Sequence, residues 1–159
     1  MSVVGVVAVF GLIQLVPYGH DHSNPPVRAE PGWDSPATRD LAVRACYDCH
    51  SNQVTYPWYS SVAPVSWLVQ HDVEDGRRRL NFSELDRPQR DANRAARAVE
   101  DGSMPPVYYL PPHPDAKLSD AERQALIAGL RTTLGDAGGN DRGRGSGRAP
   151  QAGAGQGTD

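Results

Sequence analysis

Both cysteines of the chain lie in the five-residue segment Cys46-Tyr47-Asp48-Cys49-His50. Two thiols at this spacing occur in redox pairs, in zinc sites and at haem attachment points. A thioredoxin-like redox pair belongs to a β-α-β pattern, and no segment here alternates convincingly with the period of a strand. A zinc site needs four ligands, whereas His71 and His113 are isolated in the sequence. A disulfide between Cys46 and Cys49 would close a loop too small to stabilise the fold much.

Covalent haem attachment uses all three chemical groups of the motif, since C-x-x-C-H is the signature of c-type haem attachment. Each thiol adds to one vinyl group of the haem, and the adjacent imidazole becomes the fifth ligand of the iron. The sequence therefore predicts one covalently attached haem c per chain, bound by Cys46, Cys49 and His50.

Three interpretations remain for the other face of the iron. Met104, in Gly102-Ser103-Met104-Pro105-Pro106, is the only methionine besides the initiator. A thioether ligand favours ferrous iron and raises the reduction potential. We predict Met104 as the sixth ligand, with His71 as the alternative ligand. In the third interpretation Met104 only fills a gap in the core.

Helical patterns must position these residues. Four segments have the apolar spacing of amphipathic helices, and they are residues 35–46, 64–75, 87–100 and 119–134. The first delivers the cysteine motif at its C-terminal end, Gly76 is the expected stop of the second, and a capping box begins the fourth at Ser119. The long connections carry Tyr56, Trp58, Tyr59 and Trp67, which are expected to pack against the haem or in the core.

The N-terminal segment is apolar from Val3 to Val16 at every position except Gln14. As a helix, residues 1–17 reach about 25 Å, close to the lower limit for the roughly 30 Å of a bilayer core. No basic residue precedes the segment and no small-residue cleavage site follows it, which favours an uncleaved membrane anchor over a signal peptide or a buried helix. The haem domain is then expected on the outer, periplasmic side of the cell membrane.

The predicted organisation has four parts: a membrane anchor or signal helix (1–17), a Pro-rich tether (18–34), a c-type haem-binding domain (35–135) and a disordered Gly-rich tail (136–159). His20 and His22 lie in the tether and are expected to be solvated. A net charge of −3 and a pI near 5.9 give no argument for a nucleic-acid partner.

Taken in order, the motifs of this chain resemble small class I cytochromes c and, more closely, the bacterial haem-binding domain family of membrane-anchored c-type proteins. The strings that carry the resemblance are Leu12-Ile13-Gln14-Leu15-Val16-Pro17, Ser23-Asn24-Pro25-Pro26-Val27, Cys46-Tyr47-Asp48-Cys49-His50-Ser51-Asn52, Tyr56-Pro57-Trp58-Tyr59-Ser60, Ala63-Pro64-Val65-Ser66-Trp67-Leu68-Val69, His71-Asp72-Val73, Leu80-Asn81-Phe82-Ser83 and Met104-Pro105-Pro106. The helical patterns predict an all-α fold, and the resemblance implies a monohaem domain tethered to the membrane. The expected structure is a small cytochrome c-like helical domain wrapped around a covalent haem and preceded by an N-terminal membrane helix. The segment 18–22 and the Gly-rich tail depart from the family pattern.

An iron ligated by His50 and Met104 has no open position, so the expected function is outer-sphere electron transfer without catalysis. Its partners would be the membrane and redox proteins of a respiratory chain. The alternative is a haem enzyme or sensor, peroxidase-like or gas-binding, with an open or displaceable sixth site and His71 or His113 nearby. Arginines 77–79, 87, 90, 94 and 97 form either a basic docking rim or a solvated surface.

Overall fold

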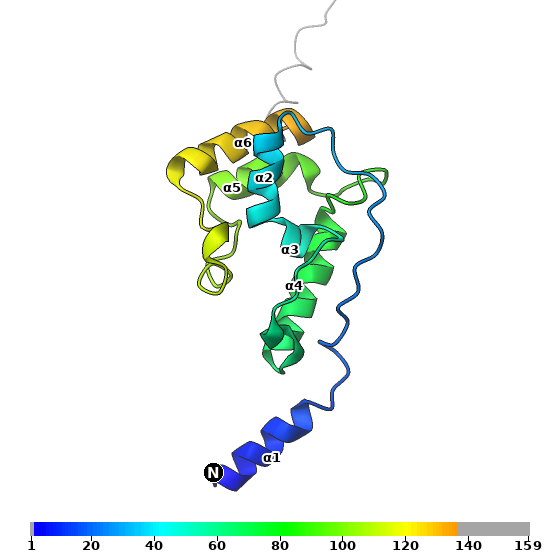
Figure 1. Cartoon of the computed structure of the whole chain (residues 1–159), viewed down its shortest axis with the longest axis vertical. Coiled ribbons are helices and arrows are strands. Elements are labelled where there is room, and N and C mark those ends of the chain that lie inside the picture. The colour runs from blue at the N-terminus through cyan, green and yellow to red at the C-terminus, as the bar shows by residue number, and fades with distance from the viewer. Residues whose placement is uncertain (1, 137–159) are drawn as a thin grey trace, which may run out of the picture.

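The computed structural model describes residues 2–136 (Figure 1). Within that range the regular structure is helical, apart from one isolated parallel bridge between Ala29 and Glu84. The α-helices are α1 (Val3–Ile13), α2 (Pro36–Ala45), α3 (Tyr47–His50), α4 (Val65–Arg79), α5 (Ala95–Glu100) and α6 (Asp120–Leu134). Three short 3₁₀ segments are η1 (Trp58–Ser61), η2 (Ala92–Arg94) and η3 (Pro114–Ala116). The predicted all-α class is therefore confirmed for the described residues.

Helices α2 and α6 start and end as their sequences predict. The Ser35 side chain accepts a hydrogen bond from the backbone N–H of Thr38, with Pro36 at the first helical position. In α6, Ser119 and Glu122 form the predicted capping box, and Gly135 follows the last turn with a φ of 83°. Local capping chemistry decides these boundaries, which is why the sequence reveals them.

The ends of two other predicted helices were wrong. The second helix does not stop at Gly76 but continues to Arg79, because Gly76 lies at a close helix contact and does not terminate α4. The third begins well after Asp86, since residues 85–91 form turns and Pro88 disfavours helical backbone in the residue before it. The predicted third helix corresponds to η2 and α5 alone, and it ends at Glu100 as expected.

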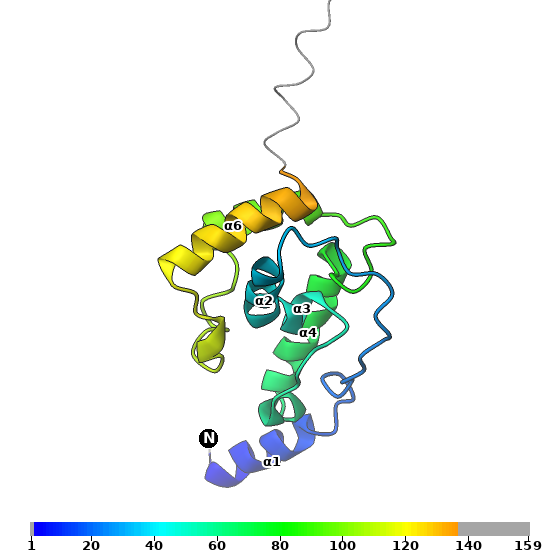
Figure 2. The same ribbon diagram turned by 45° about the horizontal axis from the view of Figure 1, so that its top comes forward.

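The core lies where α2, α5 and α6 meet, with α3 and α4 extending from it (Figures 1 and 2). Leu126, Ile127 and Leu130 of α6 pack against Leu41 and the other buried members of this cluster, which are Ala42, Tyr47, Leu80, Phe82, Ala96 and Val99. Cys46 and Met104 are partly buried against the same cluster. The helical core therefore supports two of the residues that the sequence singles out.

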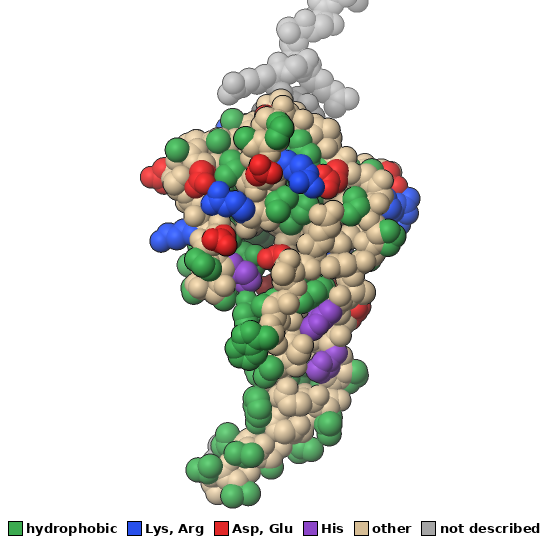
Figure 3. Space-filling model, viewed as in Figure 1, with side chains coloured by type: hydrophobic (Ala, Val, Ile, Leu, Met, Phe, Trp, Pro, Cys, Tyr) green, Lys and Arg blue, Asp and Glu red, His purple; other side chains and the backbone are tan. Residues whose placement is uncertain are grey.

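Helix α1 corrects the predicted membrane anchor. It contains 11 residues, a length of about 16 Å, against the roughly 30 Å needed to span a bilayer core. The side chain of Gln14 fixes the end of the helix. It donates hydrogen bonds to the Phe10 and Ala63 carbonyls and accepts one from the Ala63 N–H. None of its residues is buried, so it is not a core helix either (Figure 3).

No helix within residues 2–136 combines the length and the apolar character needed to cross a membrane. The prediction of a membrane-spanning helix over residues 1–17 is therefore wrong, and the predicted location on the outer side of the cell membrane loses its basis.

Residues 18–34, predicted as a tether, run without a helix alongside the helical domain (Figure 1). Asn24 exchanges two hydrogen bonds with the backbone of Val54, and the Arg28 and Ala29 N–H groups donate to the Ser83 carbonyl. His22 stacks on Tyr56 at 4.4 Å and bonds the Ser60 carbonyl, so it is not simply solvated. Of the predicted tail, residues 137–159 lie outside the described residues.

Gly129 allows α6 to cross α2 closely, and its replacement tests this packing. A Cβ at position 129 would lie 2.8 Å from the Thr38 Cβ, so Gly129→Ala forces the helices apart. We expect the free energy of unfolding to fall by about 1–3 kcal/mol, measured by urea denaturation. Gly32→Ala is the control, because a Cβ there meets no atom within 4 Å. Equal stability of the two variants would contradict the assigned packing.

Candidate functional site

The cysteine motif forms a single helical turn immediately after α2. Cys46 caps α2, and the backbone N–H groups of Cys49 and His50 both donate to the Cys46 carbonyl at 3.2 and 2.9 Å. The prediction that the first helix delivers the motif at its C-terminal end is confirmed. The turn brings two thiols and an imidazole to one end of a cavity.

Two backbone carbonyls orient the imidazole of His50. Its Nδ1 lies 3.1 Å from the Gly76 oxygen and 2.9 Å from the Leu80 oxygen, both at the C-terminal end of α4. Carbonyl oxygens only accept hydrogen bonds, so Nδ1 must carry the proton, and the lone pair of the neutral ring is on Nε2. Desolvation lowers the pKa of His50 and keeps the ring neutral. The geometry prepares Nε2 as a metal ligand.

The two cysteines are present as free, neutral thiols. Desolvation is the main reason that the pKa of each thiol rises to about 12. Redox-active pairs show the opposite shift, because they depend on a readily formed thiolate. Within residues 2–136 no three Cys, His, Asp or Glu side chains cluster as a metal site would require. The redox-pair, zinc and disulfide interpretations therefore gain no support from the structure.

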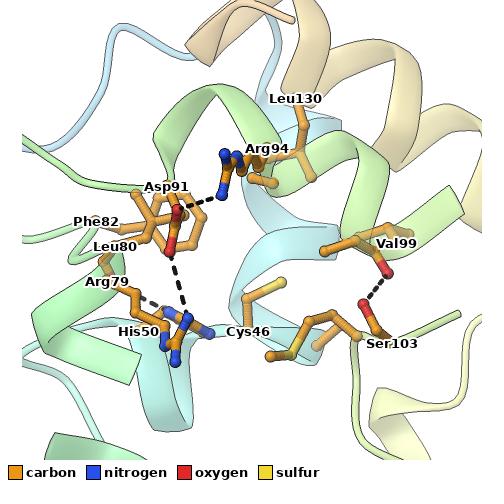
Figure 4. Close-up of a pocket in the computed structure, with 14 residues that line it drawn as sticks. Cys46, His50, Arg79, Leu80, Phe82, Asp91, Arg94, Val99, Ser103 and Leu130 are labelled. Atoms are coloured by element: carbon orange, nitrogen blue, oxygen red, sulfur yellow. Dashed lines mark hydrogen bonds and ion pairs between the residues drawn. The ribbon is translucent and has the colours of Figure 1, made fainter. Parts of the chain in front are cut away.

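Two adjoining cavities of about 270 and 140 Å³ open beside the motif. They share Ala45, Cys46, His50, Arg79 and Met104 as lining residues. The larger cavity extends to the core and is walled mainly by apolar side chains, including Leu80, Phe82, Ala95, Val99 and Leu130 (Figure 4). Such a wall suits a flat apolar ligand with few polar groups.

The turn after α5 places Met104 on this wall. Gly102 adopts a φ of 77°, which turns the chain, and the Met104 N–H donates to the Ala98 carbonyl at 2.9 Å. Arg123 of α6 fixes the end of α5 by donating to the Val99 and Glu100 carbonyls. The structure thus brings Met104 to both cavities that His50 lines.

The other histidines lie elsewhere. His71 is exposed on α4 and lines neither cavity. Both ring nitrogens of His113 have partners, the Tyr109 carbonyl at 2.8 Å and the Tyr59 hydroxyl at 3.1 Å. His113 lies in the connection between α5 and α6. Neither His71 nor His113 lies on the wall that His50 and Met104 share.

Gly76 is a contributor to the site that sequence reasoning missed. The sequence predicts Gly76 as a helix stop, but it lies inside α4, where the backbone of Cys49 packs on the helix. A Cβ there would lie 2.9 Å from the Cys49 carbonyl carbon. The signal was present, since an isolated glycine within a helical pattern often marks a close packing contact.

Asp48, between the two cysteines, also anchors the motif. Its carboxylate accepts hydrogen bonds from the Tyr109 hydroxyl at 2.7 Å and from the Thr55 N–H at 3.1 Å. Tyr109 stacks on His113, with ring centroids 3.9 Å apart. The pairing of residues 48 and 109 spans distant parts of the chain, and no local pattern in the sequence predicts it.

A polar clamp follows the motif. The Phe82 N–H donates to the His50 carbonyl at 2.8 Å, the Asn81 amide donates to Asn52, and the Asn52 N–H donates to the Ser83 hydroxyl. Asn52, Asn81 and Ser83 are buried and mutually bonded. This clamp holds the segment after α4 against the segment after His50.

The aromatic residues only partly match the expectation. Trp58 is 81% exposed, so its predicted place in the core or against a haem is wrong. Tyr59 is half-buried against His113, and Tyr108 and Tyr109 line the smaller cavity. Tyr108 also donates to Asp72 at 3.0 Å.

The family of the chain is shown by its sequence. The sequence profile of the haem-binding domain family matches residues 8–132, well over half of the chain. The chain belongs to the haem-binding domain family. The predicted family resemblance is therefore confirmed, and the haem-binding cofactor class with it.

A curated relative of this haem-binding domain is the cytochrome c peroxidase Ccp of Escherichia coli (strain K12). The two are 27% identical over 96 residues, which is 55% of this chain and 21% of that protein. The chain thus spans about a fifth of the relative's length. No solved structure matches the chain.

The residues of the cavities fit a haem. Nε2 of His50 is an oriented nitrogen donor, the thioether of Met104 is a soft donor on the same cavities, and the apolar wall suits the macrocycle. Two free thiols adjoin the nitrogen donor. This donor set suits a haem iron.

Gly76→Ala tests the contact that orients the site. The added methyl group meets the backbone of Cys49 and must displace the motif turn or α4, so we expect a loss of about 1–3 kcal/mol in the free energy of unfolding. Thermal unfolding followed by circular dichroism measures it. The helical control Gly11→Ala has no neighbour within 4 Å and should be unchanged or slightly more stable. A neutral Gly76→Ala variant would contradict the contact.

Proposed function

We propose that the protein is a monohaem c-type cytochrome that carries electrons by outer-sphere transfer. In this proposal Cys46 and Cys49 would hold the haem through thioether bonds, and Nε2 of His50 and the thioether of Met104 would ligate its iron. The observation that carries the proposal is the fixed tautomer of His50, next to two free thiols, on cavities that Met104 also lines.

The attachment chemistry needs no oxidant. Each thiol S–H would add across one vinyl C=C bond of the haem, so that sulfur bonds to one carbon and the hydrogen goes to the other. Nothing is expelled in either addition. The neutral, desolvated thiols of Cys46 and Cys49 lie beside the imidazole that ligates the same haem, so one turn both attaches and orients the cofactor.

Two protein ligands on the iron favour a carrier over an enzyme. If His50 and Met104 both ligated the iron, no coordination position would be open to a substrate, and the haem would supply a site for one-electron exchange. His/Met ligation also raises the reduction potential of a haem. The protein would exchange electrons with redox partner proteins.

The arginines predicted as a docking rim are mostly paired with acids or carbonyls. Arg78 and Arg79 bond Asp75, Arg87 bonds Glu84, and Arg77 donates to the Ser51 and Ser23 carbonyls. Such pairing lowers the net positive field of this surface. The carrier proposal therefore rests on the iron site and not on a basic rim.

A second candidate is a haem enzyme or sensor with a displaceable sixth ligand, favoured by the similarity to part of a cytochrome c peroxidase. The aligned portion is a fifth of that enzyme, and neither His71 nor His113 lines the wall shared by His50 and Met104. A wild-type protein that binds CO or cyanide readily would favour this candidate over the carrier.

Met104→Ala tests the assigned sixth ligand. Removing the thioether opens the iron, so we expect the variant to lose the far-red Met-to-ferric-iron absorption band and to bind CO. Absorption spectra of the oxidised and CO-treated reduced proteins measure both changes. The comparison variant is His71→Ala, which should keep the wild-type spectrum. An unchanged spectrum in Met104→Ala, with a changed one in His71→Ala, would contradict the assignment.

A further inference from the structure

Charged groups are distributed unevenly around the two cavities. Arg79 borders both cavities and Arg94 borders the larger one. The smaller cavity is bordered instead by two carboxylates, Asp72 and Asp75, whereas Asp91 is the carboxylate on the wall of the larger cavity. A negatively charged ligand group is therefore repelled from the smaller cavity and attracted toward the two arginines.

Asp91 lies between the two arginines (Figure 4). Its carboxylate oxygens are 3.6 Å from Nη1 of Arg79 and 3.5 Å from Nη1 of Arg94. Both distances exceed the roughly 2.7–2.9 Å of a charge-assisted hydrogen bond. Asp91 is itself fixed, because its N–H donates to the Arg79 carbonyl at 3.1 Å at the end of α4.

Both guanidinium groups retain donors for another carboxylate. Arg79 uses Nε to donate to Asp75 at 2.7 Å, and a guanidinium has five N–H donors. Arg94 makes its ion pair only with Asp91 among the described residues, and its side chain is 70% exposed. Because Asp91 lies 3.5 Å or more from both guanidinium groups, the two arginines keep free N–H donors for a second carboxylate.

A haem carries two carboxylates, which belong to its propionate groups. Its propionate carboxylates lie at the edge of the macrocycle opposite the vinyl groups. If the vinyl edge is bound at Cys46 and Cys49, the propionate edge faces away from the motif. The larger cavity runs from Cys46 to Arg94 (Figure 4).

We propose that Arg79 and Arg94, which lie on either side of Asp91, form a carboxylate-binding pair for a haem propionate. This assignment rests on the proposed function, because it takes the vinyl edge to be attached at the cysteines. The two positive charges then stabilise the electron on the iron and raise the reduction potential of the haem.

The test uses the full haem-loaded chain and the variants Arg79→Gln, Arg94→Gln and the double variant. We expect each single variant to lower the midpoint potential, the double variant to lower it further, and the propionate bending band in the resonance Raman spectrum to shift. Arg94→Lys keeps the positive charge but loses the planar guanidinium. This variant should therefore have the wild-type midpoint potential but a shifted propionate band.

Arg78→Gln and Arg97→Gln are the matched controls on α4 and α5. Neither residue lines a cavity, and both side chains are exposed. Their propionate band should stay at the wild-type position, and their potentials should change less. Because Arg94 makes a single ion pair, at 3.5 Å, its replacement leaves the fold intact.

A haem-bearing double variant with the wild-type propionate band, and a potential shift no larger than that of the controls, would overturn this assignment alone. A wild-type chain that carries no haem would overturn the proposed function and this assignment together.

Discussion

The hydrogen bond from Nδ1–H of His50 to the end of α4 is the interaction on which the site depends. It fixes the proton on one ring nitrogen and directs the lone pair of the other away from α4. The bond requires α4 to lie directly against the motif turn, and only a residue without a side chain at position 76 permits that approach. The close contact between α4 and the motif turn therefore also fixes the tautomer of His50.

The rest of the domain maintains this contact from several sides. Asp48 and Tyr109 tie the motif to the chain after α5, and the clamp of Asn52, Asn81 and Ser83 ties it to the chain after α4. Arg123 of α6 holds the end of α5, from which the chain turns to Met104. Each tie is long-range in sequence, so the site forms only when the helical core has assembled. The marginal core of so small a domain and its cofactor site stabilise each other.

The sequence predicts the parts of this structure that local chemistry decides. The caps at Ser35 and Ser119 mark the helix starts, and the cysteine spacing marks the motif turn. It does not predict what depends on tertiary contact. From the sequence, Gly76 is expected to end a helix, but in the structure the backbone of Cys49 packs on it inside α4. Gln14 is a single polar residue in an apolar run, and only its hydrogen bonds to Ala63 show that α1 ends there.

The mass and colour of the denatured chain show whether a haem is covalently attached. Protein produced in a host with a haem-attachment system is denatured, stripped of non-covalent ligands and weighed by mass spectrometry. Because thiol addition to a vinyl group expels nothing, we expect the polypeptide mass plus one intact haem, with the haem absorption retained. A bare polypeptide mass, with the colour lost on denaturation, would contradict covalent attachment at Cys46 and Cys49.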